Sequence, residues 1–128
     1  MVLKTQLFLV TFLVCQLTVF AQQDAWIYFT DKPTATASLS NPISILTQAA
    51  IDRKANHSVA IDERDVPVHE PYITLIKAST GIIYKAKSKW FNAVHVRGSE
   101  ADINSLMTTH DLVDEIVFAD SNLNARME

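Results

Sequence analysis

The side chains best suited to acid–base or metal chemistry are four histidines that lie far apart along the chain. No two of them share a spacing that is typical of metal ligands, and no cysteine lies near any of them. We therefore expect solvated or packed imidazoles, with no metal ion and no cofactor. The four are His57, His69, His95 and His110.

Catalysis by a serine nucleophile needs aspartate, histidine and serine side chains in glycine-rich turns, which expose the nucleophile and the oxyanion donors. The chain has two glycines, Gly81 and Gly98, and neither lies in such a setting. Three acids near the C-terminus offer a carboxylate pair for glycoside hydrolysis, but acids beside a last strand are typical of a solvated face. They are Asp114, Glu115 and Asp120. We expect no catalytic activity from this chain alone.

An apolar run from Leu7 to Phe20 follows Lys4 and ends at the small residue Ala21. This pattern is typical of a secretory signal peptide, and we predict cleavage between Ala21 and Gln22. An uncleaved membrane anchor needs a longer apolar segment, and a lipidated Cys15 needs a small residue before it. These two alternatives are less well supported but stay open.

The part of the chain after the predicted cleavage site is acidic and has no cysteine. Loss of Lys4 with the signal peptide changes the formal net charge from −3 to −4, which argues against nucleic acid as a partner. Loss of Cys15 excludes disulfides and thiolate chemistry. The remaining length suits one domain, and we expect a monomer that is secreted or periplasmic and has no membrane association.

Aromatic and β-branched runs alternate with segments that carry helix signals. Asn41-Pro42 and Ser99 with Asp102 are typical of helix starts, and Gly81 is placed to end a helix. The runs predict strands at 25–30, 82–86, 90–96 and 113–119, with helices after Asn41, from 71 to 80, and after Ser99.

The helix after Asn41 is best treated as an extra element, because the other elements then follow the order strand, helix, strand, strand, helix, strand. This order predicts an α+β fold of the ferredoxin-like, split βαβ type. Its four-stranded antiparallel sheet has helices on one face, and the other face is left open.

Four strings carry a resemblance to a known family: AWIYFTDKP at 25–33, DVPV at 65–68, AKSKWFNA at 86–93 and VDEIVFAD at 113–120. They resemble the pro-domains of secreted bacterial subtilisin-like serine peptidases, the S8 family, whose pro-domains are similar to the I9 inhibitors. One departure is Ala93, because such pro-domains often have glycine after the asparagine that Asn92 matches.

The resemblance implies a signal peptide at 1–21, a pro-domain at 22–120 and a linker at 121–128 toward a catalytic domain. It implies an intramolecular chaperone and temporary active-site inhibitor, with the cognate catalytic domain as its partner in cis. A free-standing secreted inhibitor of the same fold is the alternative. A small hydrolase such as an acylphosphatase fits less well, because this chain lacks a glycine-rich anion loop.

The resemblance also gives roles to particular residues. The open sheet face is expected to bind the peptidase, and protonation of His95 is expected to weaken that complex. Asp120 is expected to meet helix N-termini of the peptidase, where unpaired N–H groups favour negative charge. An extended tail is expected to bind along the substrate cleft. The expected interface residues are Phe91, Ala93, His95 and Asp120, and the tail residues are Ser121, Asn122, Leu123 and Asn124.

Overall fold

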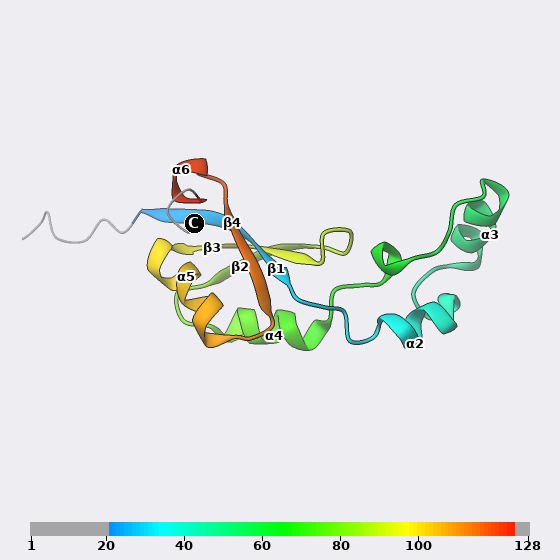
Figure 1. Cartoon of the computed structure of the whole chain (residues 1–128), viewed down its shortest axis with the longest axis horizontal. Helices are drawn as coiled ribbons and strands as arrows, with labels where there is room; N and C mark the ends of the chain where they lie inside the picture. Colours follow the sequence, from blue (N-terminus) through cyan, green and yellow to red (C-terminus); the bar gives the residue numbers. More distant parts are fainter. Residues whose placement is uncertain (1–20, 125–128) are drawn as a thin grey trace, which may run out of the picture.

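The structure is a computed structural model that describes residues 21–124, so residues 1–20 of the predicted signal peptide lie outside it. Among the described helices, none has the length and apolar character to cross a membrane. Figure 1 shows the elements, which are β1 (Gln22–Phe29), α2 (Ala35–Ser40), the 3₁₀ turn η1 (Pro42–Ser44), α3 (Gln48–Asn56), the 3₁₀ turn η2 (Glu63–Asp65), α4 (Glu70–Ala78), β2 (Ile83–Ser88), β3 (Ala93–Ser99), α5 (Glu100–Thr109), β4 (Val113–Phe118) and α6 (Ser121–Asn124).

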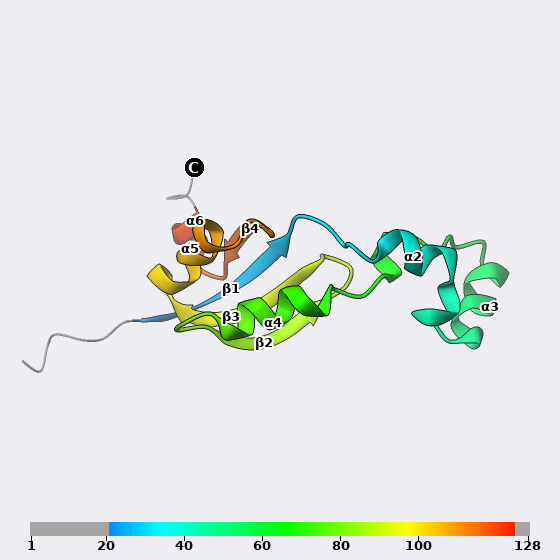
Figure 2. The ribbon, with the colours of Figure 1, turned by 90° about the horizontal axis from the view of Figure 1, so that it is seen from below.

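The four strands form one sheet in the order β2-β3-β1-β4, and every neighbouring pair is antiparallel. Helices α4 and α5 both lie below the sheet in Figure 1, and they lie in front of it in Figure 2. The element order and the strand order confirm the predicted ferredoxin-like α+β fold.

Strand β1 is central because it pairs with both β3 and β4. Its buried side chains alternate along the strand, which places Ala25, Ile27 and Phe29 on the face that the helices cover. The core under the helices brings these together with buried aliphatic side chains of the other strands and of α4 and α5, namely Ile73, Ile76, Val94, Val96, Ile103, Leu106 and Ile116.

The predicted start of α5 is confirmed, whereas α4 ends at Ala78, two residues before the predicted end at 80. Ser99 starts α5, since its hydroxyl accepts a hydrogen bond from the Asp102 backbone N–H at 3.1 Å. Gly81 follows α4 with a φ of +73°, a conformation that an L side chain rarely adopts. A Cβ atom at Gly81 would also meet the Asp102 carboxylate, so only glycine fits there.

The segment from 34 to 65 differs from the single helix expected after Asn41. It contains α2, η1, α3 and η2, which form a helical insertion at one end of the sheet (Figure 1). Asn41 makes no side-chain cap, whereas the Thr47 hydroxyl accepts a hydrogen bond from Ala50 N–H and starts a new helix, α3. Neither η1 nor α3 buries a single residue, so packing does not merge them into one helix.

The hairpin between β2 and β3 also differs from the expectation. Trp90 and Phe91 were expected in the second strand, but they lie in the turn, and β3 begins at Ala93. Asn92 makes the turn with a φ of +50°. Its side-chain amide donates hydrogen bonds to the carbonyls of Phe29 and Asp31, at 3.2 and 2.8 Å. Asparagine tolerates this left-handed conformation. Because Asn92 makes the turn, residue 93 has an extended conformation that alanine can adopt, and no glycine is needed there.

One lysine joins the sheet to the helical insertion. The Lys32 ammonium donates hydrogen bonds to the carbonyls of Glu63, Val66 and Lys89, at 2.6, 2.7 and 2.6 Å. These carbonyls belong to η2, the segment after it, and the hairpin turn. Burial is the main cause that lowers the pKa of Lys32 below its ordinary value. All three donors of the ammonium are therefore used to hold three separate segments together.

We predict that Lys32→Met lowers the free energy of unfolding by about 2 kcal/mol, because three carbonyls lose a charged donor. Urea unfolding followed by circular dichroism measures the change. Lys85→Met is the matched control, since Lys85 is exposed and makes no hydrogen bond to a described residue. Equal losses in the two variants would contradict the role of Lys32.

Candidate functional site

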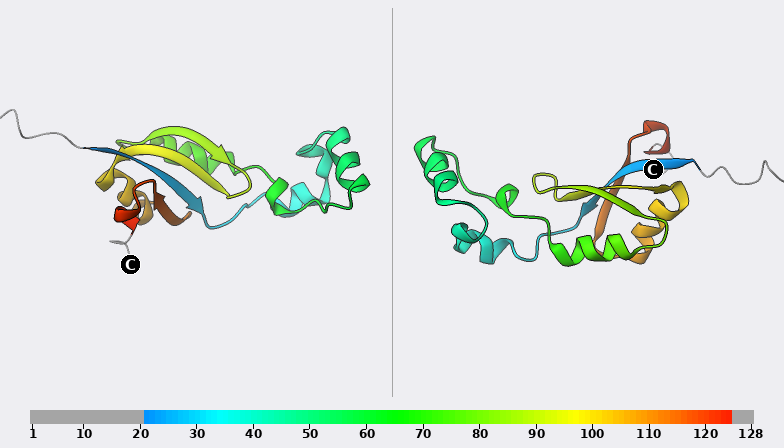
Figure 3. Two further views of the ribbon diagram at one scale, coloured as in Figure 1. Left: turned by 90° about the horizontal axis from the view of Figure 1, so that it is seen from above. Right: turned by 180° about the vertical axis from the view of Figure 1, so that it is seen from behind.

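The candidate site is the sheet face that α4 and α5 leave open. Figure 3 (left) shows the strands in front from this side, with α4 behind them. Strand pairing places residues from all four strands on this face, because directly paired residues point the same way. They include Asp24, Trp26, Tyr28, Ile83, Ala93, His95, Arg97, Glu115 and Val117.

Asp24 organises the polar part of the open face. Arg97 donates to both carboxylate oxygens of Asp24, with Nη2 2.7 Å from Oδ2 and Nε 3.1 Å from Oδ1. The hydrogen bonds from Arg97 are the main reason that the pKa of Asp24 lies below its ordinary value. His95 Nε2 lies 3.2 Å from the same carboxylate, so Asp24 is held by two neighbours on β3.

Aromatic rings lie beside this ion pair. The Trp26 ring stacks on His95, with centroids 5.3 Å apart and planes inclined by 30°. Across the sheet, Ile83 on β2 pairs with Arg97 and is 45% exposed. The open face is therefore partly apolar and partly charged, with aromatic and arginine side chains, which are enriched in protein interfaces.

The structure brings only two of the four predicted interface residues together. Ala93 and His95 lie on the open face, but Phe91 lies in the hairpin turn at one end of the sheet. Asp120 follows β4 at the opposite end, where Ala119 N–H donates to the Asp24 carbonyl. Phe91 and Asp120 therefore cannot belong to one compact contact.

The expectation of an extended tail from Ser121 is wrong for residues 121–124, which form α6. Asp120 caps this helix, since its carboxylate accepts hydrogen bonds from the backbone and side chain of Asn122 at 3.0 and 2.9 Å. Leu123 is buried in the core, and both ends of the Asn124 amide bond to the backbone of Phe118. The helix forms because β4 offers these backbone groups.

Two features that sequence reasoning missed are the Asp24–Arg97 pair and the anchoring of α6. Asp24 and Arg97 are 73 residues apart, so only the β1–β3 register brings them together. The Asn124 contact spans six residues, and no capping motif in the sequence signals it. The alternation of Asp24, Trp26 and Tyr28 with buried residues was the one available signal for the open face.

The remaining histidine contacts do not form a catalytic group. His110 Nε2 lies 3.0 Å from the Ser79 hydroxyl, but this hydroxyl donates its proton to the Leu75 carbonyl. No carboxylate that could orient His110 is hydrogen-bonded to its ring among the described residues, so the pair lacks the third member of a catalytic triad. Between residues 21 and 124, no three His, Cys, Asp or Glu side chains gather into a metal-binding group.

Comparison with known proteins gives one family. The family model described as the peptidase S8 propeptide domain of Bacteroidota matches residues 24–128. No curated protein and no solved structure matches the chain.

We predict that the Asp24 ion pair makes stability depend on pH. Because its pKa is lowered in the folded state, the pair stabilises the fold above the ordinary value of 3.8, and this contribution is lost as the pH falls through the folded value. Asp24→Asn should therefore be less stable than the unmodified chain at about pH 6, with a smaller difference at about pH 3.

Urea unfolding at both pH values tests this prediction. Asp114→Asn is the matched control, because Asp114 is an exposed acid on β4 without an ion pair to a described residue. A difference in the free energy of unfolding between Asp24→Asn and the unmodified chain that is the same at both pH values would contradict this prediction.

Proposed function

We propose that this chain, which belongs to the peptidase S8 propeptide family of Bacteroidota, serves the catalytic domain of its precursor as an intramolecular chaperone and temporary active-site inhibitor. The family makes the chain the propeptide of an S8 peptidase, and it implies a secreted precursor with a cognate catalytic domain in cis. We propose that residues 1–21 are the signal peptide, with cleavage between Ala21 and Gln22.

The open sheet face is the observation that supports this proposal. Helices α4 and α5 cover one face of the sheet, while Trp26 and His95 on the other face are covered by no described element. A partly apolar face of this kind is stabilised when a partner covers it. The catalytic domain of the same precursor is the partner that the family supplies.

A shared precursor makes such a contact strong at any protein concentration. Tethering raises the effective concentration of the domain to the order of millimolar, so inhibition is stronger in the precursor than after cleavage. The same contact explains the chaperone role. A domain that binds only the native catalytic domain stabilises it by mass action, and the stabilisation ends when the domain leaves.

The tail is proposed to block the substrate cleft as a bound product. Ser121, Asn122, Leu123 and Asn124 form α6, whose Leu123 is buried, so these residues reach the cleft only if α6 unfolds. We therefore propose that α6 remains in place and that the segment after Asn124 pairs with the cleft by backbone hydrogen bonds. We propose that Asp120 contacts helix N-termini of the peptidase while its carboxylate also caps α6.

We predict that Ile83→Glu weakens inhibition of the cognate catalytic domain at least tenfold, about 1.4 kcal/mol of binding free energy. The substitution places a charge on the open face, where the partner excludes water. Leu75→Glu is a close control, since both side chains are 45% exposed and Leu75 lies on the opposite, helical side. Inhibition constants that are equal for the two variants would contradict the proposed interface.

We predict that a chain ending at Asn124 inhibits at least tenfold more weakly than the chain ending at Glu128. Its free energy of unfolding should not change, because α6 and the Leu123 contact are kept. A chain ending at Asp120 is a poor test, since it also removes a buried leucine, which costs about 2–5 kcal/mol. Equal inhibition by the chains ending at Asn124 and Glu128 would show that the segment after Asn124 makes no contact.

A further inference from the structure

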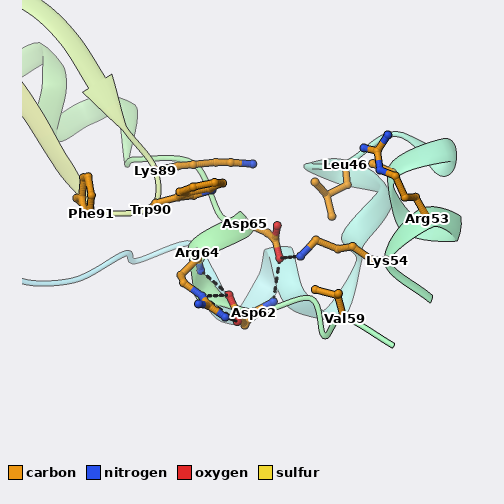
Figure 4. A pocket seen from close by; sticks show the side chains of 11 residues that line it. Leu46, Arg53, Lys54, Val59, Asp62, Arg64, Asp65, Lys89, Trp90 and Phe91 are labelled. Atoms are coloured by element: carbon orange, nitrogen blue, oxygen red, sulfur yellow. Dashed lines mark hydrogen bonds and ion pairs between the residues drawn. The ribbon is translucent and has the colours of Figure 1, made fainter. Parts of the chain in front are cut away.

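We propose that a second surface of this domain, the hollow between the hairpin turn and the helical insertion, receives a surface segment of the attached catalytic domain. The segment carries a large apolar side chain beside a carboxylate. This inference rests on the proposed function, because the occupant belongs to the same partner. The hollow has a volume of about 600 Å³ and is shown in Figure 4.

The walls of the hollow are largely apolar. Trp90 and Phe91 of the hairpin turn are 70% and 61% exposed. In Figure 4 the Trp90 side chain extends toward Leu46 of the insertion, and Val59 and Ala50 complete the apolar lining. Two adjacent exposed aromatic rings are costly in water and are typical anchors of a protein interface.

The apolar side chains of the helical insertion do not pack into the hydrophobic core of the domain. Helix α3 buries no residue, and no side chain of residues 34–65 belongs to the hydrophobic core of the sheet. Val59 is itself half exposed. The insertion therefore presents apolar groups that only an added partner can cover.

The charged residues around the hollow indicate which charge the incoming segment carries beside its apolar side chain. Lys54 is paired with Asp65 at 2.9 Å, and Arg64 is paired with Asp62. Burial acts to raise the pKa of Asp65, but the hydrogen bonds from Lys54 and from the Asp62 backbone outweigh it and lower the pKa. These two acids are thus matched by two bases.

Two further bases on the hollow make no ion pair with an acid among residues 21–124, although Lys89 adds to the attraction that lowers the pKa of Asp65. They are Arg53 on α3 and Lys89 in the hairpin turn, and both line the hollow. In a chain with a formal net charge of −3, this leaves a local positive excess next to the exposed aromatics. A carboxylate on the incoming segment is the group that such an excess binds.

The position of the hollow fits one partner across both surfaces. In Figure 1, α4 and α5 lie below the sheet, whereas α3 rises above it at the hairpin end. Helix α3 and the open face therefore lie toward the same side of the molecule, while α2 lies level with α4 on the helical side. A catalytic domain seated on the open face would then have the insertion against its flank.

Binding of the chain from Gln22 to Glu128 to its cognate catalytic domain, with the nucleophilic serine replaced by alanine, tests this inference by calorimetry. We expect the pair Trp90→Ala and Phe91→Ala to raise the dissociation constant at least tenfold. The pair Arg53→Glu and Lys89→Glu should raise it and make it less dependent on salt. Ile43→Ala is the control, because Ile43 is 54% exposed in the same insertion but lies outside the hollow.

The outcomes separate this inference from the proposed function. If Ile83→Glu weakens binding while the Trp90 and Phe91 variant binds like the unmodified chain, the hollow is not an interface and the proposed function stands. If the unmodified chain does not bind, both fail. A chain that dimerises through Trp90 would assign the hollow to a second copy and overturn the inference. Both aromatics are exposed, so unchanged urea unfolding of the variant excludes misfolding as the cause of weaker binding.

Discussion

The Lys32 ammonium is the interaction on which the arrangement of this domain depends. Its three hydrogen bonds are directed to carbonyls that come from three segments of the chain, up to 57 residues away. A carbonyl that is turned inward needs a donor, and a cation provides a stronger one than a neutral group does. The helical insertion has no buried core of its own, so its position relative to the sheet is set largely by this lysine, while the Lys54–Asp65 ion pair joins α3 to η2 within the insertion.

The same junction shapes the open face and the hollow. Asn92 ties the hairpin turn to the carbonyls of Phe29 and Asp31, one residue before Lys32. Because the turn is fixed in this way, Trp90 and Phe91 lie outside the strands, and their exposed side chains line the hollow beside the insertion. Strand β3 then starts at Ala93, which sets the register that brings Arg97 and His95 to Asp24. The open face and the hollow are thus two results of one set of backbone contacts.

Prediction from sequence succeeded where the signal is local. The Ser99 cap of α5 and the left-handed Gly81 each depend on neighbours within a few residues, and each was predicted. Prediction from sequence failed where contacts between distant segments of the chain determine the bounds of an element. The start of β3 depends on hydrogen bonds from Asn92 to Phe29 and Asp31, and α6 depends on the backbone of β4. The candidate site was half predicted for the same reason, since the order of helices and strands predicted an open sheet face but only the strand register gave its ion pair.

Because the insertion has no hydrophobic core, it is locally less stable than the sheet and the helices that cover it. Residues 34–65 bury only Ala35, Ser38 and Asp65, so this segment can open while the sheet stays folded. A peptidase cleaves chains that can leave their fold locally, and it does so at the least stable segment first. In the free domain, the insertion is then the place where digestion begins. Digestion at the insertion would then limit the lifetime of the released domain.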